Sequence, residues 1–214
     1  MMMKPPKMLD NKRNGKVSDE LRENLRKGSR ISVISAYFTI YAFNDLKKEL
    51  SKIDKMRFIF TEPTFVKKDR ELIREYYIDR NEKKISGNEF EIKLRNELKQ
   101  SHIARECAEW LKEKVEVKSL KQANPAQPRL IYIENPEDNV SINGTVDFTT
   151  DGLGITNSNR IDSNMCIYGK DFTLHFLKMF DELWTDETAV EDVKQKVLDQ
   201  MQILYKENTP EFIY

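Results

Sequence analysis

Apolar residues gather in short runs along this chain, and these runs alternate with longer amphipathic segments. Runs rich in β-branched and aromatic residues predict buried strands at 31–38, 56–60, 130–133 and 165–168. The segment 115–120 alternates apolar and polar positions, which is typical of a half-exposed strand, and 140–142 is a further short strand. The near-continuous apolar character of 31–38 indicates burial on both faces of a sheet.

Other segments carry apolar residues at helical spacing. They predict a helix that begins at Ser18 and stops at Gly28, followed by helices at 39–50, 68–80, 90–98, 101–112, 172–184 and 188–205. Strand, helix and strand follow one another between 31 and 60, which predicts a parallel right-handed crossover. The fold class we predict is α/β, with a mixed, mostly parallel sheet of about seven strands and helices on both faces. The last helix pair, within 172–206, closes one side.

A chain of 214 residues suits one domain, or one domain with an appendage. We predict a flexible, basic lead-in at 1–16, a main domain at 17–184, and a C-terminal helix with the start of a linker at 185–214. A polar loop with Gly87 is expected at 82–88. The closing sequence TPEFIY looks like a chain cut where a longer protein continues.

Charge and cysteine content limit the functions to consider. Lys and Arg total 36 and so do Asp and Glu, so no global field attracts nucleic acid and any DNA contact needs a local basic patch. Cys107 and Cys166 lack CxxC spacing and no histidine cluster is present, so we expect no metal, no cofactor and a reducing, cytoplasmic setting. No run approaches ~18 apolar residues, and the N-terminus lacks the apolar core of a signal peptide, so no membrane association is expected.

The stretch 127–153 carries the candidate chemistry. It predicts a hairpin, with a polar turn built on Asn135 and Pro136 and a second strand that ends at Asn143 and Gly144. Residues 144–153 then place small, hydroxyl and acidic residues around one phenylalanine. A glycine lets the backbone approach an anion closely, and threonine hydroxyls with backbone N–H groups can hold phosphate oxygens. The segment therefore predicts a phosphate-binding turn.

This arrangement resembles the phospholipase D superfamily. Its members carry His-x-Lys on one strand and, after a short hairpin, a Gly-Ser-x-Asn-Phe-Thr segment that ends in Gly-Leu. The second half is matched here by Gly144, Thr145, Asp147, Phe148, Thr149, Gly152 and Leu153. The first half is matched by spacing only, because Gln127 stands at the position of the His and Arg129 at that of the Lys.

The resemblance implies a phospholipase-D-like three-layer sandwich with a degenerate active site. The family's histidine attacks phosphorus, and the amide of Gln127 cannot do so at neutral pH. We therefore assign no catalytic residue; the positions equivalent to the family's motif are Gln127, Arg129 and Asp147. A phosphate site is expected, in which Arg129 makes bidentate contacts and Asp147 orients it. Its predicted members are Arg129, Gly144, Thr145, Asp147 and Thr149.

Most of 17–184 also resembles the N-terminal phospholipase-D-like domains of bacterial Swi/Snf-type DNA helicases. The segments that carry this resemblance are SDELRENLRKGSRISVISAYFTIYAF, FIFTEPTF, SHIARECAEWL and NPAQPRLI. It implies DNA and a downstream helicase region in the same chain as partners. It also implies a homodimer as an alternative, since chains with a single motif in this superfamily dimerise so that two motifs share one active site.

Other residues offer alternatives that the sequence leaves open. His102 begins a predicted helix and His175 lies among phenylalanines, so a surface or capping role for the first and partial core burial for the second are the simpler interpretations. Glu134 is either a base or an exposed turn acid. Tyr37, Phe38 and Tyr41 either stack on bases, as in single-strand binders, or belong to the core. The basic pairs 12–13, 67–68 and 83–84 are typical of solvated faces.

Three functions follow from these observations. The one we favour is a nucleic-acid-binding or targeting domain of a larger bacterial helicase-type protein, with a degenerate phosphodiester site. The second is an active phosphodiesterase or nuclease that acts as a dimer. The third is a purely structural interaction domain.

Overall fold

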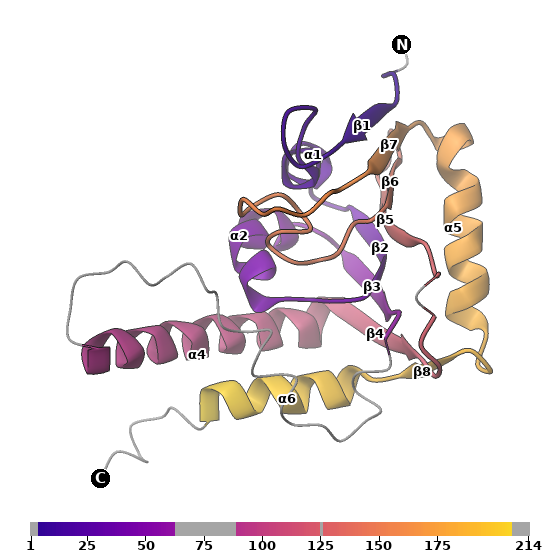
Figure 1. Ribbon diagram of the computed structural model, residues 1–214. Helices are drawn as coiled ribbons and strands as arrows, with labels where there is room; N and C mark the ends of the chain where they lie inside the picture. Colours follow the sequence, from indigo (N-terminus) through magenta and orange to yellow (C-terminus); the bar gives the residue numbers. More distant parts are fainter. Residues whose placement is uncertain (1–3, 63–88, 125, 207–214) are drawn as a thin grey trace.

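The computed structural model describes residues 4–62, 89–124 and 126–206 (Figure 1). The helix predicted at 68–80, the loop at 82–88 and the basic pairs 67–68 and 83–84 lie outside these residues. The fold is mixed α/β, as predicted. Its centre is a single sheet, with helices packed on both faces.

Eight strands form the sheet within the described part of the chain, in the order β1-β7-β6-β5-β2-β3-β4-β8. Their bounds are β1 Lys7–Leu9, β2 Arg30–Ser35, β3 Lys55–Phe60, β4 Val115–Leu120, β5 Arg129–Glu134, β6 Val140–Gly144, β7 Asn164–Tyr168 and β8 Val190–Asp192. Only β2–β3 and β3–β4 pair in parallel, and the other neighbours are antiparallel.

The prediction of a mostly parallel sheet is therefore wrong. A parallel pair needs a long crossover, which is usually a helix. Helices α2 and α4 supply such crossovers from β2 to β3 and from β3 to β4. By contrast, β5, β6 and β7 follow one another with no helix between them, so each must run back along its neighbour.

Two hydrophobic clusters cover the two faces of the sheet. The helices are α1 Val17–Asn24, α2 Ile40–Leu50, α4 Glu89–Lys114, α5 Lys170–Thr185 and α6 Lys194–Lys206. Neighbouring β2 residues point to opposite faces, so Val33 packs in the cluster beneath α1, α2, α4 and α6. Ile34 packs beneath α5, beside Phe180. Figure 1 shows α5 alone on its face of the sheet.

Both edges of the sheet differ from the prediction. Residues 7–9 were expected in a flexible lead-in, yet they form β1, which pairs with β7 and buries Leu9. Residues 190–192 were expected in a helix, yet they form β8 because β4 offers an unpaired edge and Val190 is buried against it. The sheet thus extends beyond the predicted domain limits at 17 and 184.

The two helices predicted at 90–98 and 101–112 are one helix, α4. No glycine or proline occurs between 89 and 114, so nothing in the sequence breaks the helix at Ser101. Trp110 near its end is buried, and its indole donates to the carbonyl of Leu50 at 3.1 Å, which fixes α4 to α2. Among the residues that the structure describes, no helix has the length and apolar character needed to cross a membrane.

A buried carboxylate fastens β1 to the rest of the sheet. Glu20 on α1 accepts the Lys7 ammonium at 2.7 Å and the Tyr168 hydroxyl at 2.6 Å. Burial by itself raises the pKa of Glu20, but the hydrogen bonds from Lys7 and Tyr168 and the charge of Lys4 outweigh it and lower the pKa overall. A carboxyl group whose pKa is lower in the folded than in the unfolded state stabilises the protein at pH values above the unfolded-state pKa. This stabilisation is lost as the pH falls through the folded-state pKa.

We expect Glu20→Gln to lower the free energy of unfolding by about 2 kcal/mol at pH 7, because a charge-assisted pair is lost. The difference from wild type should shrink as the pH falls below the ordinary value of 4.5, since Glu20 then becomes protonated. Urea unfolding from pH 7 to pH 3 measures this. Glu23→Gln, at an exposed carboxyl that pairs with Lys4, is the control. A difference that stays constant with pH would rule out the charged role of Glu20.

Candidate functional site

The ends of three neighbouring central strands, β6, β5 and β2, meet on one side of the sheet. Strand β5 runs antiparallel to both of its neighbours and pairs Leu130 with Ile34 of β2 and Arg129 with Gly144 of β6. The start of β5 therefore lies beside the C-terminal ends of β2 and β6. The loop that follows β6 carries Asp147 into this corner, as the predicted hairpin implied.

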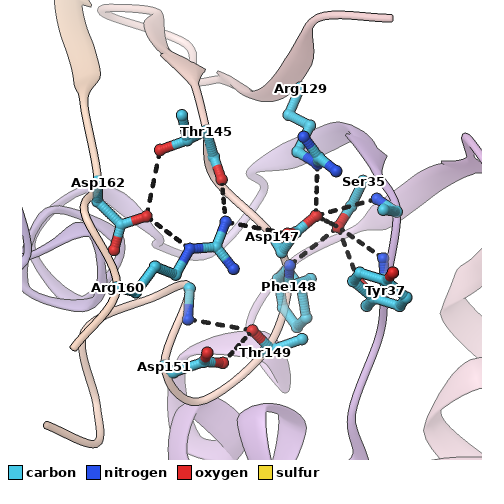
Figure 2. Close-up of polar contacts among 12 residues, drawn as sticks. Ser35, Tyr37, Arg129, Thr145, Asp147, Phe148, Thr149, Asp151, Arg160 and Asp162 are labelled. Atoms are coloured by element: carbon cyan, nitrogen blue, oxygen red, sulfur yellow. Dashed lines mark hydrogen bonds and ion pairs between the residues drawn. The ribbon is translucent and has the colours of Figure 1, made fainter. Parts of the chain in front are cut away.

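Asp147 is the centre of the site and its carboxylate is almost fully buried, with 2% of the side chain exposed. Its Oδ1 accepts the backbone N–H of Ala36 at 3.0 Å and the hydroxyl of Ser35 at 3.2 Å. Arg129 and Arg160 approach the same carboxylate, at 2.7 Å and 3.0 Å (Figure 2). A buried carboxylate needs such partners, because an unpaired charge in the interior is costly.

Arg129 is held from one side only. Its Nε lies 2.7 Å from Asp147 Oδ1, but the N–H is not aligned for a hydrogen bond, so the contact is an ion pair. The two terminal nitrogens of Arg129 have no partner among the residues described. Because 26% of the side chain is exposed, these nitrogens can meet solvent or a ligand.

Arg160 is held more completely. Its Nη2 donates to Asp147 Oδ2 and to the carbonyl of Thr145, and its Nε donates to Asp162 Oδ1 at 2.8 Å (Figure 2). Burial acts to lower the pKa of Arg160, but the hydrogen bond and charge of Asp147, followed by the charge of Asp162, raise it above its usual value. Asp162 itself accepts hydrogen bonds from the Thr145 hydroxyl at 3.1 Å and from the side-chain amide of Asn11 at 2.9 Å. We call Ser35, Arg129, Asp147, Arg160 and Asp162 the Asp147 cluster.

The hydroxyls predicted to bind phosphate are used inside the fold. Thr145 donates its hydroxyl to Asp162 and accepts the N–H of Ser163 at 3.1 Å. Thr149 donates to Asp151 at 2.7 Å and accepts the N–H of Gly152 at 3.0 Å, which forms the tight turn visible in Figure 2. Thr149 makes no hydrogen bond to the side chain of Arg129 or Asp147 in the part of the chain described. Among the predicted phosphate-binding residues, Arg129 thus pairs with Asp147, whereas the hydroxyls of Thr145 and Thr149 are bound elsewhere in the fold.

Gly144 has a packing reason to be glycine. Its φ is +144°, and a Cβ built on it would lie 2.1 Å from the carbonyl oxygen of Ser163. The close approach that we expected toward an anion is occupied by the chain's own backbone. A phosphate contact at Gly144 stays a prediction.

Several other candidates lie outside the cluster. Gln127 is half-buried and donates its backbone N–H to Asn124 at 3.0 Å. Glu134 ends β5 at the end opposite Arg129, so it cannot serve as a base there. His102 is exposed on α4, with its Nε2 3.6 Å from Glu106. His175 was expected to be partly buried, yet it is exposed on α5, where its ring lies 3.8 Å from that of Phe176.

Phe38, one of the aromatics considered for base stacking, packs against the hydrophobic core. Phe38 stacks on Phe148, with ring centroids 5.4 Å apart and planes 3° from parallel, and it meets Phe58 edge to face. The backbone of Thr39 also donates to the carbonyl of Phe148 at 3.1 Å. These contacts attach the Asp147 loop to the start of α2. Phe38 is half-buried and its ring is engaged by Phe148 and Phe58, which favours the core interpretation over base stacking.

The sequence analysis assigned no role to Arg160, Asp162 or Ser35. The structure brings all three to Asp147. Ser35 ends a strand that points at the site, and its hydroxyl also accepts the N–H of Phe148 at 3.0 Å. A serine at the end of a buried strand, and an arginine two residues from an aspartate, are the signals that the sequence offered. Neither is specific by itself.

The chemistry available at the cluster is the positioning of guanidinium groups. Two arginines face two aspartates, so the cluster is formally neutral. Neither imidazole contacts it among the residues described, and no group of three or more potential metal ligands occurs within them. What distinguishes Arg129 from Arg160 is that both of its terminal nitrogens lack a partner among the residues described, whereas Nη2 of Arg160 is hydrogen-bonded to Asp147 and Thr145.

Similarity to known proteins is found among solved structures. No family model matches the sequence, and no curated protein matches it. Among solved structures, phosphatidylserine synthase from Haemophilus influenzae Rd KW20 is similar over 97% of this chain, at 10% identity and a TM-score of 0.48. Nuc, a phospholipase D family member from Salmonella typhimurium, is similar over 88% of this chain, at 13% identity and a TM-score of 0.44.

This chain covers 46% of the phosphatidylserine synthase and 98% of Nuc. It thus spans less than half of the synthase. Because both TM-scores are below 0.5, the proposals that follow rest on the geometry of the Asp147 cluster and not on these two proteins.

Proposed function

We propose that this chain is a nucleic-acid-binding domain of the phospholipase-D-like type, which holds a phosphate of the nucleic-acid backbone but has lost the covalent chemistry. The observation that carries this proposal is the state of Arg129. Its inner edge is fixed by the buried carboxylate of Asp147 and its outer nitrogens are unpaired in the described structure. A guanidinium held in this way presents a fork that matches phosphate oxygens.

The absence of a nucleophile at the motif position supports binding over cleavage. Gln127 replaces the histidine that the resemblance would require, and its amide cannot attack phosphorus at neutral pH. Asp147 and Ser35 are occupied with Arg129, Ala36 and Phe148. The sequence resemblance to N-terminal domains of bacterial Swi/Snf-type helicases extends the proposal: the domain would direct a downstream helicase region to DNA.

The test of this proposal combines a cleavage assay with a binding assay. We expect no cleavage of single-stranded, duplex or branched DNA, with or without chelator, because loss of a nucleophile removes most of the rate enhancement. Binding should be in the micromolar range or weaker at physiological salt, since the net charge is zero and few phosphates are contacted. Metal-independent single-turnover cleavage above background would reject the proposal in favour of an active phosphodiesterase.

A further inference from the structure

Beside the Asp147 cluster, on the side of Asp162 and Asp151, the surface is hollowed. The hollow has a volume of about 170 Å³, and its lining includes Lys12, Asp151, Thr156, Ser158, Arg160 and Asp162. It lies between the N-terminal segment and the loop 154–163, two parts of the chain that are far apart in sequence. We call it the loop hollow.

Asn11 holds the two walls of the loop hollow together. Its backbone is in the left-handed region, with φ +58°. Its side-chain nitrogen donates to Asp162 and to the carbonyl of Gly152, each at 2.9 Å, and its oxygen accepts the N–H of Val17 at 3.0 Å. A Cβ on Gly154 would lie 2.6 Å from that oxygen, so the contact is close. These bonds fix the position of the neighbouring residue, Lys12.

The acids at the loop hollow are largely satisfied by the protein. Both oxygens of Asp162 accept hydrogen bonds, one from Thr145 and Arg160 and the other from Asn11. Asp151 accepts the Thr149 hydroxyl on one oxygen, and no other described residue donates to its second oxygen. A ligand that enters the loop hollow therefore meets one open carboxylate oxygen.

The cations at the loop hollow keep more of their capacity. The ammonium of Lys12 and the Nη1 of Arg160 have no partner among the residues described, and both residues line the hollow. Arg160 is also anchored to Asp147 by Nη2, so its guanidinium cannot swing away. Open donors thus outnumber open acceptors, which favours an anionic ligand.

We propose that the loop hollow binds a terminal phosphate group, with Lys12 and Arg160 on the phosphate and Asp151 available to a sugar hydroxyl. Its volume is below the roughly 300 Å³ at which pockets for drug-sized ligands begin, so it suits one phosphate and part of its sugar. Arg160 touches the same carboxylate as Arg129, so a strand whose backbone contacts Arg129 can place its phosphorylated end in the loop hollow. The inference that the phosphate belongs to a strand end rests on the proposed function.

The test compares single strands of one sequence, roughly 12 nucleotides long and internally labelled, that end in hydroxyls, in a 5′-phosphate or in a 3′-phosphate. We expect one phosphorylated strand to bind wild type about fivefold more tightly than the hydroxyl strand. Lys12→Ala and Arg160→Gln should abolish this preference. Lys48→Ala, at an exposed lysine near the C-terminal end of α2, should keep it. Arg129→Ala should weaken binding of all three strands and leave the preference intact.

Equal affinity of wild type for the three strands would overturn the strand-end assignment, and so would a preference that survives both Lys12→Ala and Arg160→Gln. Thermal unfolding checks that Arg160→Gln is folded, and exposed Lys12 gives a variant that leaves the fold intact.

A second arm uses inorganic phosphate alone and follows the amide resonances of Lys12 and Ser158. Shifts that disappear in Lys12→Ala, without binding of any strand, would support the loop hollow for a free phosphate and reject the proposed DNA function. No shifts and no preference would reject the loop hollow.

Discussion

Replacing Asp147 by alanine is expected to lower the free energy of unfolding by about 3 kcal/mol, the low end of the range for breaking a buried ion pair. The variant would leave Arg129 and Arg160 without their shared carboxylate, and the N–H of Ala36 without an acceptor. Because about a quarter of each arginine side chain is exposed, water would recover part of the loss. Chemical denaturation at neutral pH and constant salt measures the effect.

Asp151→Ala is the matched control for this prediction. Asp151 lies in the same loop and accepts one hydroxyl, from Thr149, but it is only half-buried and forms no ion pair with another described residue. Its replacement should cost less than about 1 kcal/mol. Asp147→Asn should fall between the two variants, since an amide oxygen can accept from Ala36 but cannot balance two guanidinium groups. Equal losses for Asp147→Ala and Asp151→Ala would show that Asp147 does not organise the site.

Gly144→Ala is expected to destabilise the protein by about 2 to 3 kcal/mol, through backbone strain and overpacking together. Gly144 has φ +144°, and the new Cβ would lie 2.1 Å from the carbonyl oxygen of Ser163 and 3.0 Å from the Cα of Asn164. Both atoms belong to the backbone of the neighbouring segment, so they cannot move aside cheaply. The separation of β6 from β7 at this end would have to increase.

Gly28→Ala separates strain from overpacking. Gly28 also has a positive φ, +87°, but a Cβ there meets nothing within 4 Å. It should cost about 1 kcal/mol, the penalty for a non-glycine residue in that conformation. Thermal or denaturant unfolding of both variants gives the comparison. If Gly144→Ala is no worse than Gly28→Ala, the close contact with Ser163 is relieved by a shift that we do not foresee.

The contact between Arg129 and Asp147 could be predicted because it follows from local rules. A hairpin fixes which strand ends lie together, and the register then brings the loop after Gly144 back to the start of β5. Arg160 could not be predicted in the same way. It lies in an irregular loop, and its position depends on long-range bonds to Asp162, Thr145 and Asp147 that no periodicity encodes.

The errors in the fold have a similar origin. The strand positions at 31–38, 56–60 and 115–120 followed from their apolar patterns, and β2, β3 and β4 occupy most of them. The direction of pairing followed only in part. The parallel pair β2–β3 and the hairpin β5–β6 agree with the prediction, but the antiparallel pairs β2–β5 and β6–β7 were not foreseen. Strands β1 and β8 have three residues each and form because a neighbouring strand offers a free edge. Such tertiary pairing overrides the local preference for a loop or a helix.

The predicted roles of Thr145 and Thr149 show the limits of a motif. A motif specifies which residue types occur, but not whether their hydroxyls are free. Here both hydroxyls are bound within the protein. Of the predicted phosphate-binding residues, Arg129 alone combines a fixed position with unpaired donors in the described structure.

The salt dependence of DNA binding in an Arg129→Ala variant tests the central claim most directly. Fluorescence anisotropy of labelled single-stranded and duplex DNA over a salt series gives the slope of log K against log salt concentration. Arg26→Ala, at an exposed arginine whose nearest carboxylate is Glu137 at 3.7 Å, is the control for loss of one charge. Arg129→Lys keeps the charge, and thermal unfolding verifies that each variant is folded. We predict weaker binding by Arg129→Ala with a slope reduced by about one, and a slope close to wild type for Arg129→Lys and Arg26→Ala. Binding by Arg129→Ala that equals wild type at every salt concentration would contradict the account.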